Sequence, residues 1–478
     1  MIRGPIALFA MPLAIAIALF AAIGCGDPST SSGQADDDDA SYDTEPVDDD
    51  DVPDDDTDDD ADDDVDDDAD DDDEPACDES LRPIVFVHGF LAAGDTWANH
   101  TMRFASNGHC LERMYAFDYN TLGLGLSDVA NLDALIDSAL AASGATQVDL
   151  AGHSRGGGVG VQYLSAPARA AKVAHYAHVA AGGWLSPPGG VPTMTISSAG
   201  DLIAGVGTIP GATNVELDNQ DHMQTAASKE SFEAMYTFFH DGDEPATTDI
   251  VPQDEPAAWG RVVTLGENIP GALTPISVWP VDPATGLRLT DDPVAEFTTD
   301  DLGYWGPFDA QPDTYYEFFV EPVGVDQYPI HYYREPFARS NDLVYLRIFP
   351  DPDSLAGQIL GQIEFADDRA VFITFTPNQA TVAGRDTLFV DGYELSTEEI
   401  TPAERTAIAI FYFDANDNGE TDAEPAGGLF SGFPFLAGFD LFVDTETDRA
   451  IEMEFNGRTM AVRNWPSASD GASIAVFE

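Results

Sequence analysis

The chain has 478 residues, 44% of them hydrophobic, which is enough for more than one domain with a real core. Its formal charge is −68: 27 acidic residues and no Lys or Arg lie between Asp36 and Glu74, and the other 439 residues hold 60 acidic and 19 basic residues. Such a surface repels phosphates and argues against nucleic acid as a partner. It suits salty surroundings, where screening weakens self-repulsion, and a lineage of generally acidic proteins explains it equally well.

Residues 1–25 are predicted to be a signal peptide. Arg3 supplies a short positive region, an apolar run covers residues 6–23, and small residues precede Cys25. The Ala22-Ile-Gly-Cys25 stretch resembles the lipobox of bacterial lipoproteins, whose cysteine is acylated, although that motif prefers Leu where Ala22 stands. We expect an exported protein with a membrane anchor at Cys25, held at the bacterial cell envelope or surface. A plain signal peptide with an extracellular product and a single membrane anchor stay open as alternatives.

Residues 26–78 are predicted to be an acidic, disordered tether, because their like charges repel and they cannot bury apolar surface. Cys77 lies six residues before the apolar run that starts at Pro83, and Cys110 lies shortly before the run 114–117. If those runs are parallel neighbours, both cysteines lie at one edge of the sheet. A disulfide between them then suits an oxidising compartment. Two free thiols are the alternative.

Residues 79–243 alternate between strand and helix patterns. Fully apolar runs are typical of strands whose two faces are both covered. They predict strands at 83–87, 114–117, 147–150, 173–180 and 193–197. Amphipathic periodicity predicts helices at 96–107, 131–143, 156–164 and 229–240. This alternation predicts a doubly wound, mostly parallel sheet.

From about residue 257 the pattern changes to short Val, Ile, Tyr and Phe runs between Pro, Gly, Asp and Asn clusters. Helical periodicity is nearly absent, so an all-β C-terminal region is predicted. Its length of about 220 residues exceeds one small sandwich. We predict two sandwich or barrel modules, at 257–350 and 351–478.

The strongest chemical signal is Gly152-His-Ser-Arg-Gly156. It follows a predicted strand and opens a predicted helix, which is the context of a nucleophile elbow. The two glycines permit a sharp turn that lifts the hydroxyl of Ser154 clear of the sheet. We predict that Ser154 is a catalytic nucleophile.

A serine nucleophile needs a base and an acid that orients the base. His222 lies in a polar loop before the last predicted helix and follows Ser154 in the order that such folds require. Asp201 follows the strand predicted at 193–197, at the end where α/β sites assemble. Asp218 and Asp221 are rivals for the role of acid, but they belong to the loop of His222 itself. We predict a triad of Ser154, Asp201 and His222.

Hydrolysis of an ester also needs donors for the developing oxyanion. The backbone N–H of Arg155, directly after the nucleophile, is one candidate. The second is the backbone N–H of Phe90, because Gly89 lets the loop after the first strand bend toward Ser154. His88 is expected to be structural.

Three stretches together resemble the lipase branch of the α/β-hydrolases: Ile84-Val-Phe-Val-His-Gly-Phe90, Gly152-His-Ser-Arg-Gly156, and Gly211-Ala-Thr-Asn with His222. Residues 246–254 and 331–337 resemble an archaeal lipase type with a C-terminal β-barrel domain. The resemblance covers about residues 83–478. It implies an α/β-hydrolase fold, a lipid or ester substrate, no required cofactor, and a β-domain that helps to bind long acyl chains.

Two departures from that archaeal type bear on the site. The type places its acid after an earlier strand, but residues 179–184 here contain none, so Asp201 matches the position that other lipases use. The type also has a long lid insertion, whereas only residues 119–127 precede the next helix here. We expect little interfacial activation, fair activity on shorter esters, and an apolar rim made by Leu122, Leu124 and Leu126.

A weaker motif, Asp414-Ala-Asn-Asp-Asn-Gly419, resembles the start of an EF-hand calcium loop. The candidate ligands are Asp414, Asn416, Asn418 and Asp422. Pro425 stands where the bidentate Glu belongs and no helix flanks the loop, so an Asx-rich hairpin turn is the alternative to calcium.

The sequence therefore predicts a secreted serine ester hydrolase of the lipase or carboxylesterase type. A polyester depolymerase or a thioesterase would use the same triad. A different class stays open as well, an inactive adhesion or binding lipoprotein on a hydrolase scaffold.

Overall fold

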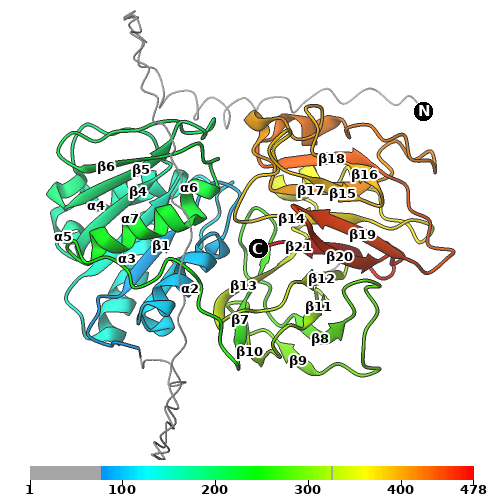
Figure 1. Cartoon of the computed structure of the whole chain (residues 1–478), viewed down its shortest axis with the longest axis horizontal. Helices are drawn as coiled ribbons and strands as arrows, with labels where there is room; N and C mark the ends of the chain where they lie inside the picture. The colour runs from blue at the N-terminus through cyan, green and yellow to red at the C-terminus, as the bar shows by residue number, and fades with distance from the viewer. Residues whose placement is uncertain (1–76, 324–326) are drawn as a thin grey trace, which may run out of the picture. The chain divides into compact units, whose positions relative to one another are not determined.

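A computed structural model describes residues 77–323 and 327–478 of the chain (Figure 1). The predicted signal peptide, Cys25 and all but the last two residues of the predicted tether lie outside the described residues. No helix within the described ranges is long and apolar enough to cross a membrane.

The first part of the described chain is built on one six-stranded parallel sheet in the order β2-β1-β3-β4-β5-β6. Alternate residues of β1 point to opposite faces, so Ile84 and Phe86 join one core while Val85 and Val87 join another. This is why the strand is apolar throughout. The strands are β1 (Ile84–Val87), β2 (Met114–Phe117), β3 (Val148–His153), β4 (Val173–Val179), β5 (Thr193–Ser198) and β6 (Thr213–Leu217).

Helices cover both faces of this sheet, as the doubly wound prediction required. The side chains of α2 and α7 fill one core, and those of α3 and α4 fill the other. Ser228 caps α7 by accepting a hydrogen bond from the Ser231 N–H, and α3 ends at Gly144 in the left-handed conformation. The elements are α2 (Ala98–Ser106), α3 (Asp128–Ser143), α4 (Arg155–Leu164), α5 (Pro167–Ala170), α6 (Gln224–Ala227), α7 (Lys229–Phe239), η1 (Gly94–Trp97), η2 (Leu111–Arg113) and η3 (Pro188–Gly190).

The rest of the chain is almost entirely β-structure, which confirms the predicted fold class. A three-stranded sheet has the order β10-β7-β13, an eight-stranded sheet β18-β17-β14-β21-β12-β11-β8-β9, and a four-stranded sheet β16-β15-β19-β20. The strands are β7 (Ala257–Thr264), β8 (Pro275–Val281), β9 (Ala295–Thr298), β10 (Tyr304–Asp309), β11 (Tyr315–Val320), β12 (Ile330–Arg334), β13 (Asn341–Ile348), β14 (Phe372–Phe375), β15 (Leu388–Val390), β16 (Tyr393–Glu394), β17 (Ala409–Phe413), β18 (Leu436–Asp440), β19 (Ala450–Phe455), β20 (Arg458–Arg463) and β21 (Ala472–Val476), with short helices at α8 (Leu355–Leu360), η4 (Ala403–Arg405) and η5 (Gly428–Gly432).

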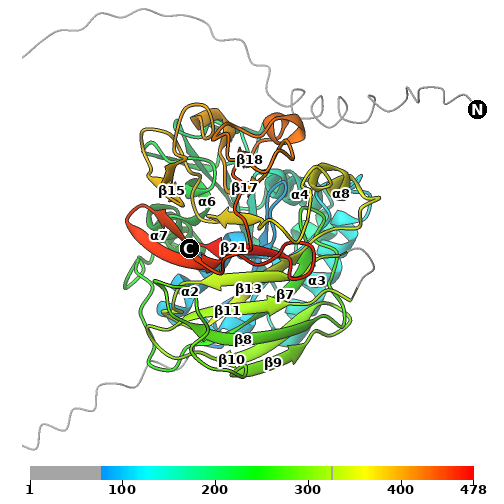
Figure 2. The ribbon, with the colours of Figure 1, turned by 90° about the vertical axis from the view of Figure 1, so that its right-hand side faces the viewer.

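The eight-stranded sheet runs across the predicted module boundary near residue 351. The last strand, β21, lies between β12 and β14 and pairs in parallel with both. One hydrophobic core accordingly contains Ile330 and Val344 from before the boundary and Phe411 and Ile474 from after it. The two predicted modules therefore share one sheet, whose strands can be followed in Figure 2, and one core.

Buried polar contacts join the parallel sheet's loops to the β-region. Arg347 in β13 makes a bidentate pair with Asp95, with both distances 2.7 Å. Tyr345, also in β13, donates a hydrogen bond of 2.6 Å to Asp118, and Arg261 in β7 pairs with the same carboxylate. The strand ends of the first part are thus fixed by side chains that come from more than 140 residues later in the chain.

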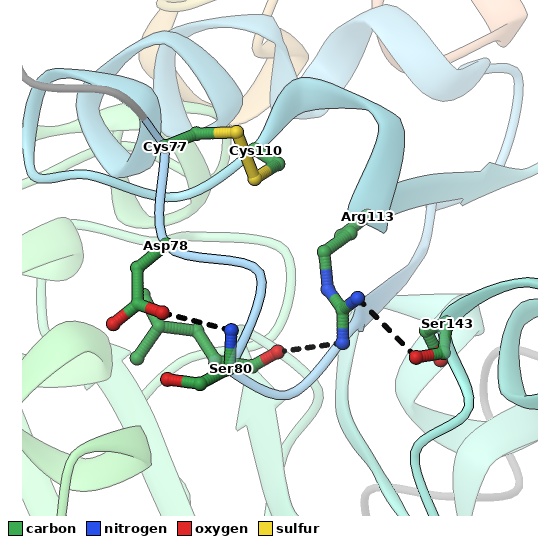
Figure 3. Close-up of a disulfide and its surroundings, with 7 residues drawn as sticks. Cys77, Asp78, Ser80, Cys110, Arg113 and Ser143 are labelled. Carbon is green, nitrogen blue, oxygen red and sulfur yellow. Dashed lines mark hydrogen bonds between the residues drawn. A yellow bond between two sulfur atoms is a disulfide. The ribbon is translucent and has the colours of Figure 1, made fainter.

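A disulfide joins Cys77 and Cys110, the pair expected from the sequence, with a Cα–Cα distance of 4.8 Å (Figure 3). The strands β1 and β2 that follow the two cysteines are parallel neighbours. Beside the disulfide, Arg113 donates to the backbone carbonyls of Leu81 and Ser143. The bond and this arginine together tie the start of the described chain to the edge of the sheet.

Candidate active site

Ser154 occupies a sharp turn between the end of β3 and the start of α4. Its backbone has φ 53° and ψ −122°, a strained conformation for a residue other than glycine. The two flanking glycines make the turn feasible. A Cβ on Gly152 would lie 2.7 Å from the carbonyl oxygen of Gly156, and a Cβ on Gly156 would collide with the carbonyls that end β1. The turn has the geometry of the nucleophile elbow that the motif predicts, and the nucleophilic role of Ser154 stays a prediction.

Asp201 and His222 lie in contact at the same edge of the sheet. His222 Nδ1 is 2.8 Å from Asp201 Oδ2, and both side chains are almost fully buried. The other carboxylate oxygen, Oδ1, accepts hydrogen bonds from the backbone N–H groups of Ile203 and Ala204 at 2.8 and 2.9 Å. The carboxylate is therefore fixed in place and can hold Nδ1 of the imidazole in its protonated tautomer.

His222 Nε2, the nitrogen that a general base would use, is buried and makes no hydrogen bond within the described residues. No hydrogen bond joins it to Ser154 there. The two residues nonetheless share one neighbour: the ring of His153, directly before Ser154, lies 4.6 Å from the ring of His222. Catalytic hydrogen bonds are commonly long in unliganded enzymes and shorten when substrate binds.

The loop after β1 approaches the nucleophile closely. A Cβ on Gly89 would lie 3.1 Å from the Cβ of Ser154 and 3.0 Å from Nδ1 of His153, so glycine permits the approach. Phe90 follows in this loop, and Arg155 opens α4 at its positive end. Both backbone N–H groups therefore belong to segments that border Ser154, and their role as oxyanion donors stays a prediction.

The other histidines beside the sheet have structural partners. His88 is fully buried, stacks on Tyr119 with ring centroids 4.6 Å apart, and lies near Asp118. Burial lowers the pKa of His88, and it lowers that of His153 well below the ordinary range. His175 lies within hydrogen-bonding distance of Asp149, and His178 within that of Tyr176. Ring contacts join His109 to His240 and His100 to Trp97.

The rivals for the acid lie away from Nδ1. Asp218 is exposed. Asp221 is buried, but its carboxylate accepts hydrogen bonds from backbone N–H groups and pairs with Arg385 of the β-region. Among the three aspartates, Asp201 alone contacts the imidazole of His222 through an interaction that the described structure contains.

The resemblance implied a β-region that helps to bind acyl chains, but sequence reasoning named none of the residues that this region brings to the site. Phe435 stacks on His222 with ring centroids 5.8 Å apart. It also lines an apolar cavity together with Leu91, the residue after Phe90. The cavity's other walls come from both sides of the molecule: Leu122, Leu265, Gly266, Tyr332, Arg347, Ala356, Ile359, Leu360, Ile373, Phe375, Ile408, Ala409, Phe411, Leu436 and Ile474. No local motif marks residues so distant in the chain.

The predicted calcium loop is a turn with internal hydrogen bonds. Asp414 accepts from the N–H groups of Asn418 and Gly419 and pairs with Arg369. The side-chain amides of Asn416 and Asn418 donate to Asp422. Within the described ranges no group of three or more His, Cys, Asp or Glu side chains is arranged to hold a metal ion. Calcium here stays a prediction that depends on asparagine oxygens.

Comparisons with known families match three parts of the chain. Residues 81–165 match the family model of class 2 lipases, residues 257–349 match the lipase C-terminal domain, and residues 377–477 match a further C-terminal domain. No curated protein matches the chain.

Solved structures similar to this chain include three bacterial hydrolases, all of them at low identity. An esterase of Rhodococcus sp. ECU1013, RhEst1, is 15% identical over 35% of this chain and 94% of its own, with a TM-score of 0.29. The Bacillus licheniformis lipase BlEst2 is 14% identical over 34% and 94%, with a TM-score of 0.31. The Bacillus subtilis carboxylesterase CesB is 12% identical over 35% and 87%, with a TM-score of 0.27.

Proposed function

We propose that this protein is a secreted serine hydrolase that cleaves lipid or lipid-like carboxylic esters. Its matches to the class 2 lipases and to the lipase C-terminal domain support this proposal. One observation carries the proposal. The buried Asp201–His222 pair lies beside a nucleophile elbow whose serine has the required strained backbone. Ester hydrolysis is the chemistry that this arrangement of nucleophile, base and acid performs.

The proposed reaction runs through an acyl-enzyme. His222 Nε2 takes the proton of the Ser154 hydroxyl as Oγ attacks the ester carbonyl, and the carbonyl electrons move to oxygen. The backbone N–H groups of Phe90 and Arg155 donate hydrogen bonds to this oxyanion. The imidazolium, stabilised by Asp201, then protonates the leaving alcohol. Water repeats the sequence on the acyl-enzyme, releases the carboxylic acid and restores Ser154.

The apolar cavity supports a lipid-like acyl group as the substrate. Leu91, next to the proposed oxyanion donor Phe90, and Phe435, which stacks on His222, both line it, and we infer that it takes the acyl chain of an ester bound at Ser154. The short loop after β2 exposes Leu124 and Leu126 to solvent by about nine-tenths of their surface, in line with the expected apolar rim. Without a long lid, activity should rise smoothly through the solubility limit of a long-chain ester.

Export and anchoring complete the proposal. The Cys77–Cys110 disulfide supports passage through an oxidising compartment, where such bonds form and persist. Acylation of Cys25 would then hold the enzyme at the cell envelope through the acidic segment. Mass spectrometry of the mature N-terminus tests this point, since an unmodified Cys25 would leave only a plain signal peptide or membrane anchor.

The decisive test measures hydrolysis of p-nitrophenyl esters from acetate to palmitate by the exported chain, with both Cys77 and Cys110 present. Ser154→Ala should abolish turnover and labelling by a fluorophosphonate probe, whereas Ser165→Ala, at an exposed helix end, should change neither. The chain-length optimum would distinguish an esterase from a lipase. A folded chain that neither hydrolyses nor labels would favour the binding lipoprotein. Activity on thioesters or polyesters alone would favour those hydrolases.

A further inference from the structure

Asp221, directly before His222, organises the loop that carries the proposed general base. Its Oδ1 accepts hydrogen bonds from the backbone N–H groups of Met223 and Gln224, at 2.8 and 2.9 Å. Its backbone carbonyl accepts from Thr225 through both N–H and hydroxyl. These bonds fold the residues after His222 into the first turn of α6, so the position of the Asp221 carboxylate sets that of the imidazole.

The other oxygen of this carboxylate is bound from the β-region. Asp221 Oδ2 accepts a hydrogen bond of 3.1 Å from the backbone N–H of Ala380 and lies 2.8 Å from Nη1 of Arg385. Nη1 of Arg385 also donates to the side-chain oxygen of Gln224 at 2.9 Å. Asp386 pairs with the same guanidinium and holds it in place. Ala380 and Arg385, which reach across, and Asp386 behind them all belong to the C-terminal module, defined here as residues 377–477.

A small hydrophobic cluster surrounds this bridge. Its buried members are Met223 from the His222 loop and Ala380, Ile408 and Phe435 from the C-terminal module. Partly buried side chains from each of the other site loops pack on it: Phe90 and Leu91 after β1, and Ile203 after β5. The three loops that border Ser154 therefore meet on a surface that the C-terminal module supplies.

The bridge also controls the charge of Asp221. Burial raises the pKa of this carboxyl, and the Arg385 guanidinium opposes the rise. Without the Arg385 guanidinium, the buried carboxylate of Asp221 would be bound only by N–H donors. A protonated or displaced Asp221 would no longer accept the same set of bonds, and the turn after His222 would loosen.

We propose that the C-terminal module positions the general base, with Arg385 and the Ala380 N–H holding Asp221 so that the His222 loop stays in register with Asp201 and Ser154. This inference rests on the proposed esterase function. It makes Arg385 and Asp221 positioning residues, which act through His222 and touch no substrate. Misplacing a catalytic group by about 1 Å can cost roughly a hundredfold in rate.

The test uses the exported chain and p-nitrophenyl acetate, whose acyl group is too short to probe the cavity. Arg385→Met should lower kcat at least about tenfold while KM changes less than about twofold, because binding is unaffected. Arg385→Lys should recover part of the loss by restoring the cation. Asp221→Asn should lower kcat similarly, and the Arg385→Met/Asp221→Asn double variant should be no slower than the worse single variant.

Arg449→Met is the matched control, because Arg449 makes a bidentate pair with Asp391 in the same module. It should leave kcat unchanged. An unchanged kcat in both Arg385→Met and Asp221→Asn, or equal losses in Arg449→Met, would overturn the inference. If Arg385→Met fails to fold, Asp221→Asn and Arg385→Lys decide. A wild-type chain without any ester turnover or probe labelling would instead refute the proposed function, and this inference with it.

Discussion

The two halves of this site are built in opposite ways. Ser154, Asp201 and His222 lie in loops that follow β3, β5 and β6 of one parallel sheet, within 69 residues of one another. The β-region instead contributes single side chains from far along the chain: Phe435 beside His222, and Arg385 beside Asp221. The chemistry is local in sequence, whereas the walls and supports of the site are distant.

Because of this difference, mutations in the two regions should have different effects. Parallel strands bring their C-terminal ends to one edge, so a βα fold assembles a triad with few long-range choices. The β-region instead depends on an eight-stranded sheet in which the last strand, β21, pairs with both β12 and β14. A mutation in the first half should therefore act on the reaction. A mutation at the junction, where side chains of the β-region contact the loops of the parallel sheet, should act first on stability or on geometry.

The largest effect is expected in the parallel-sheet half. Asp201→Asn should lower kcat about 10⁴-fold, because an amide at this position favours the wrong tautomer of His222. The substitution should affect catalysis and leave the free energy of unfolding nearly unchanged. Steady-state kinetics on a p-nitrophenyl ester, with Asp218→Asn as the exposed control, would check it. A loss below tenfold would mean that another group orients the imidazole.

The second-largest effect is expected at the junction. Arg347→Met leaves the carboxylate of Asp95 buried without its bidentate partner, so the free energy of unfolding should fall by about 3–5 kcal/mol. Denaturant titration measures this loss. The Asp95→Asn/Arg347→Met double variant should recover part of the stability, since no unpaired charge remains. Independent, additive losses would show that the two side chains do not stabilise each other.

The sequence allowed most of the parallel-sheet half to be predicted. Its strands are apolar runs and its nucleophile has a local motif, so Ser154 could be predicted together with candidates for the base and acid. The strand β6 was not predicted, because it is an edge strand with largely exposed residues such as Thr213 and Glu216 and lacks an apolar run. From β3 to β6 the order of the strands in this sheet follows their order along the chain.

The strand pairing of the β-region could not be predicted in the same way. Its strands are visible as short runs, but their partners are set by contacts over more than 100 residues, such as Ile330 with Ala472. One sheet crosses the predicted boundary near 351, although the two C-terminal family matches, at 257–349 and 377–477, fall on either side of it. Nothing local in Arg385 or Phe435 points to the active site, because their role exists only after these pairings form.

A pH effect should arise at the junction. Burial raises the pKa of Asp342, next to Leu343 of β13, to about 7, with nearby Glu112 adding to the rise. A carboxyl with a raised folded pKa contributes stability at low pH that is lost as pH rises through about 7. Asp342→Asn should therefore match the wild type at pH 4 and be more stable by about 1–3 kcal/mol at pH 8. Equal stabilities at pH 8 would mean that Asp342 ionises freely in the folded chain.

The smallest effect is expected from calcium at the Asp414 loop, far in sequence from the triad. Asp440 strengthens the prediction: it is buried, its Oδ1 has no hydrogen-bond partner in the described ranges, and its Oδ2 faces Asn416. If the amides of Asn416 and Asn418 turn their oxygens inward, they and Asp422 supply the hard oxygen ligands that calcium takes. Weak binding of this kind would stabilise the fold by about 1 kcal/mol and raise Tm by about 2–4 °C. Calorimetry of chelator-treated protein measures this shift on adding calcium, and Asp422→Asn should abolish it. A shift that persists in Asp422→Asn would place the ion elsewhere, and no shift in the wild type would leave the loop as an Asx-rich turn held by Arg369.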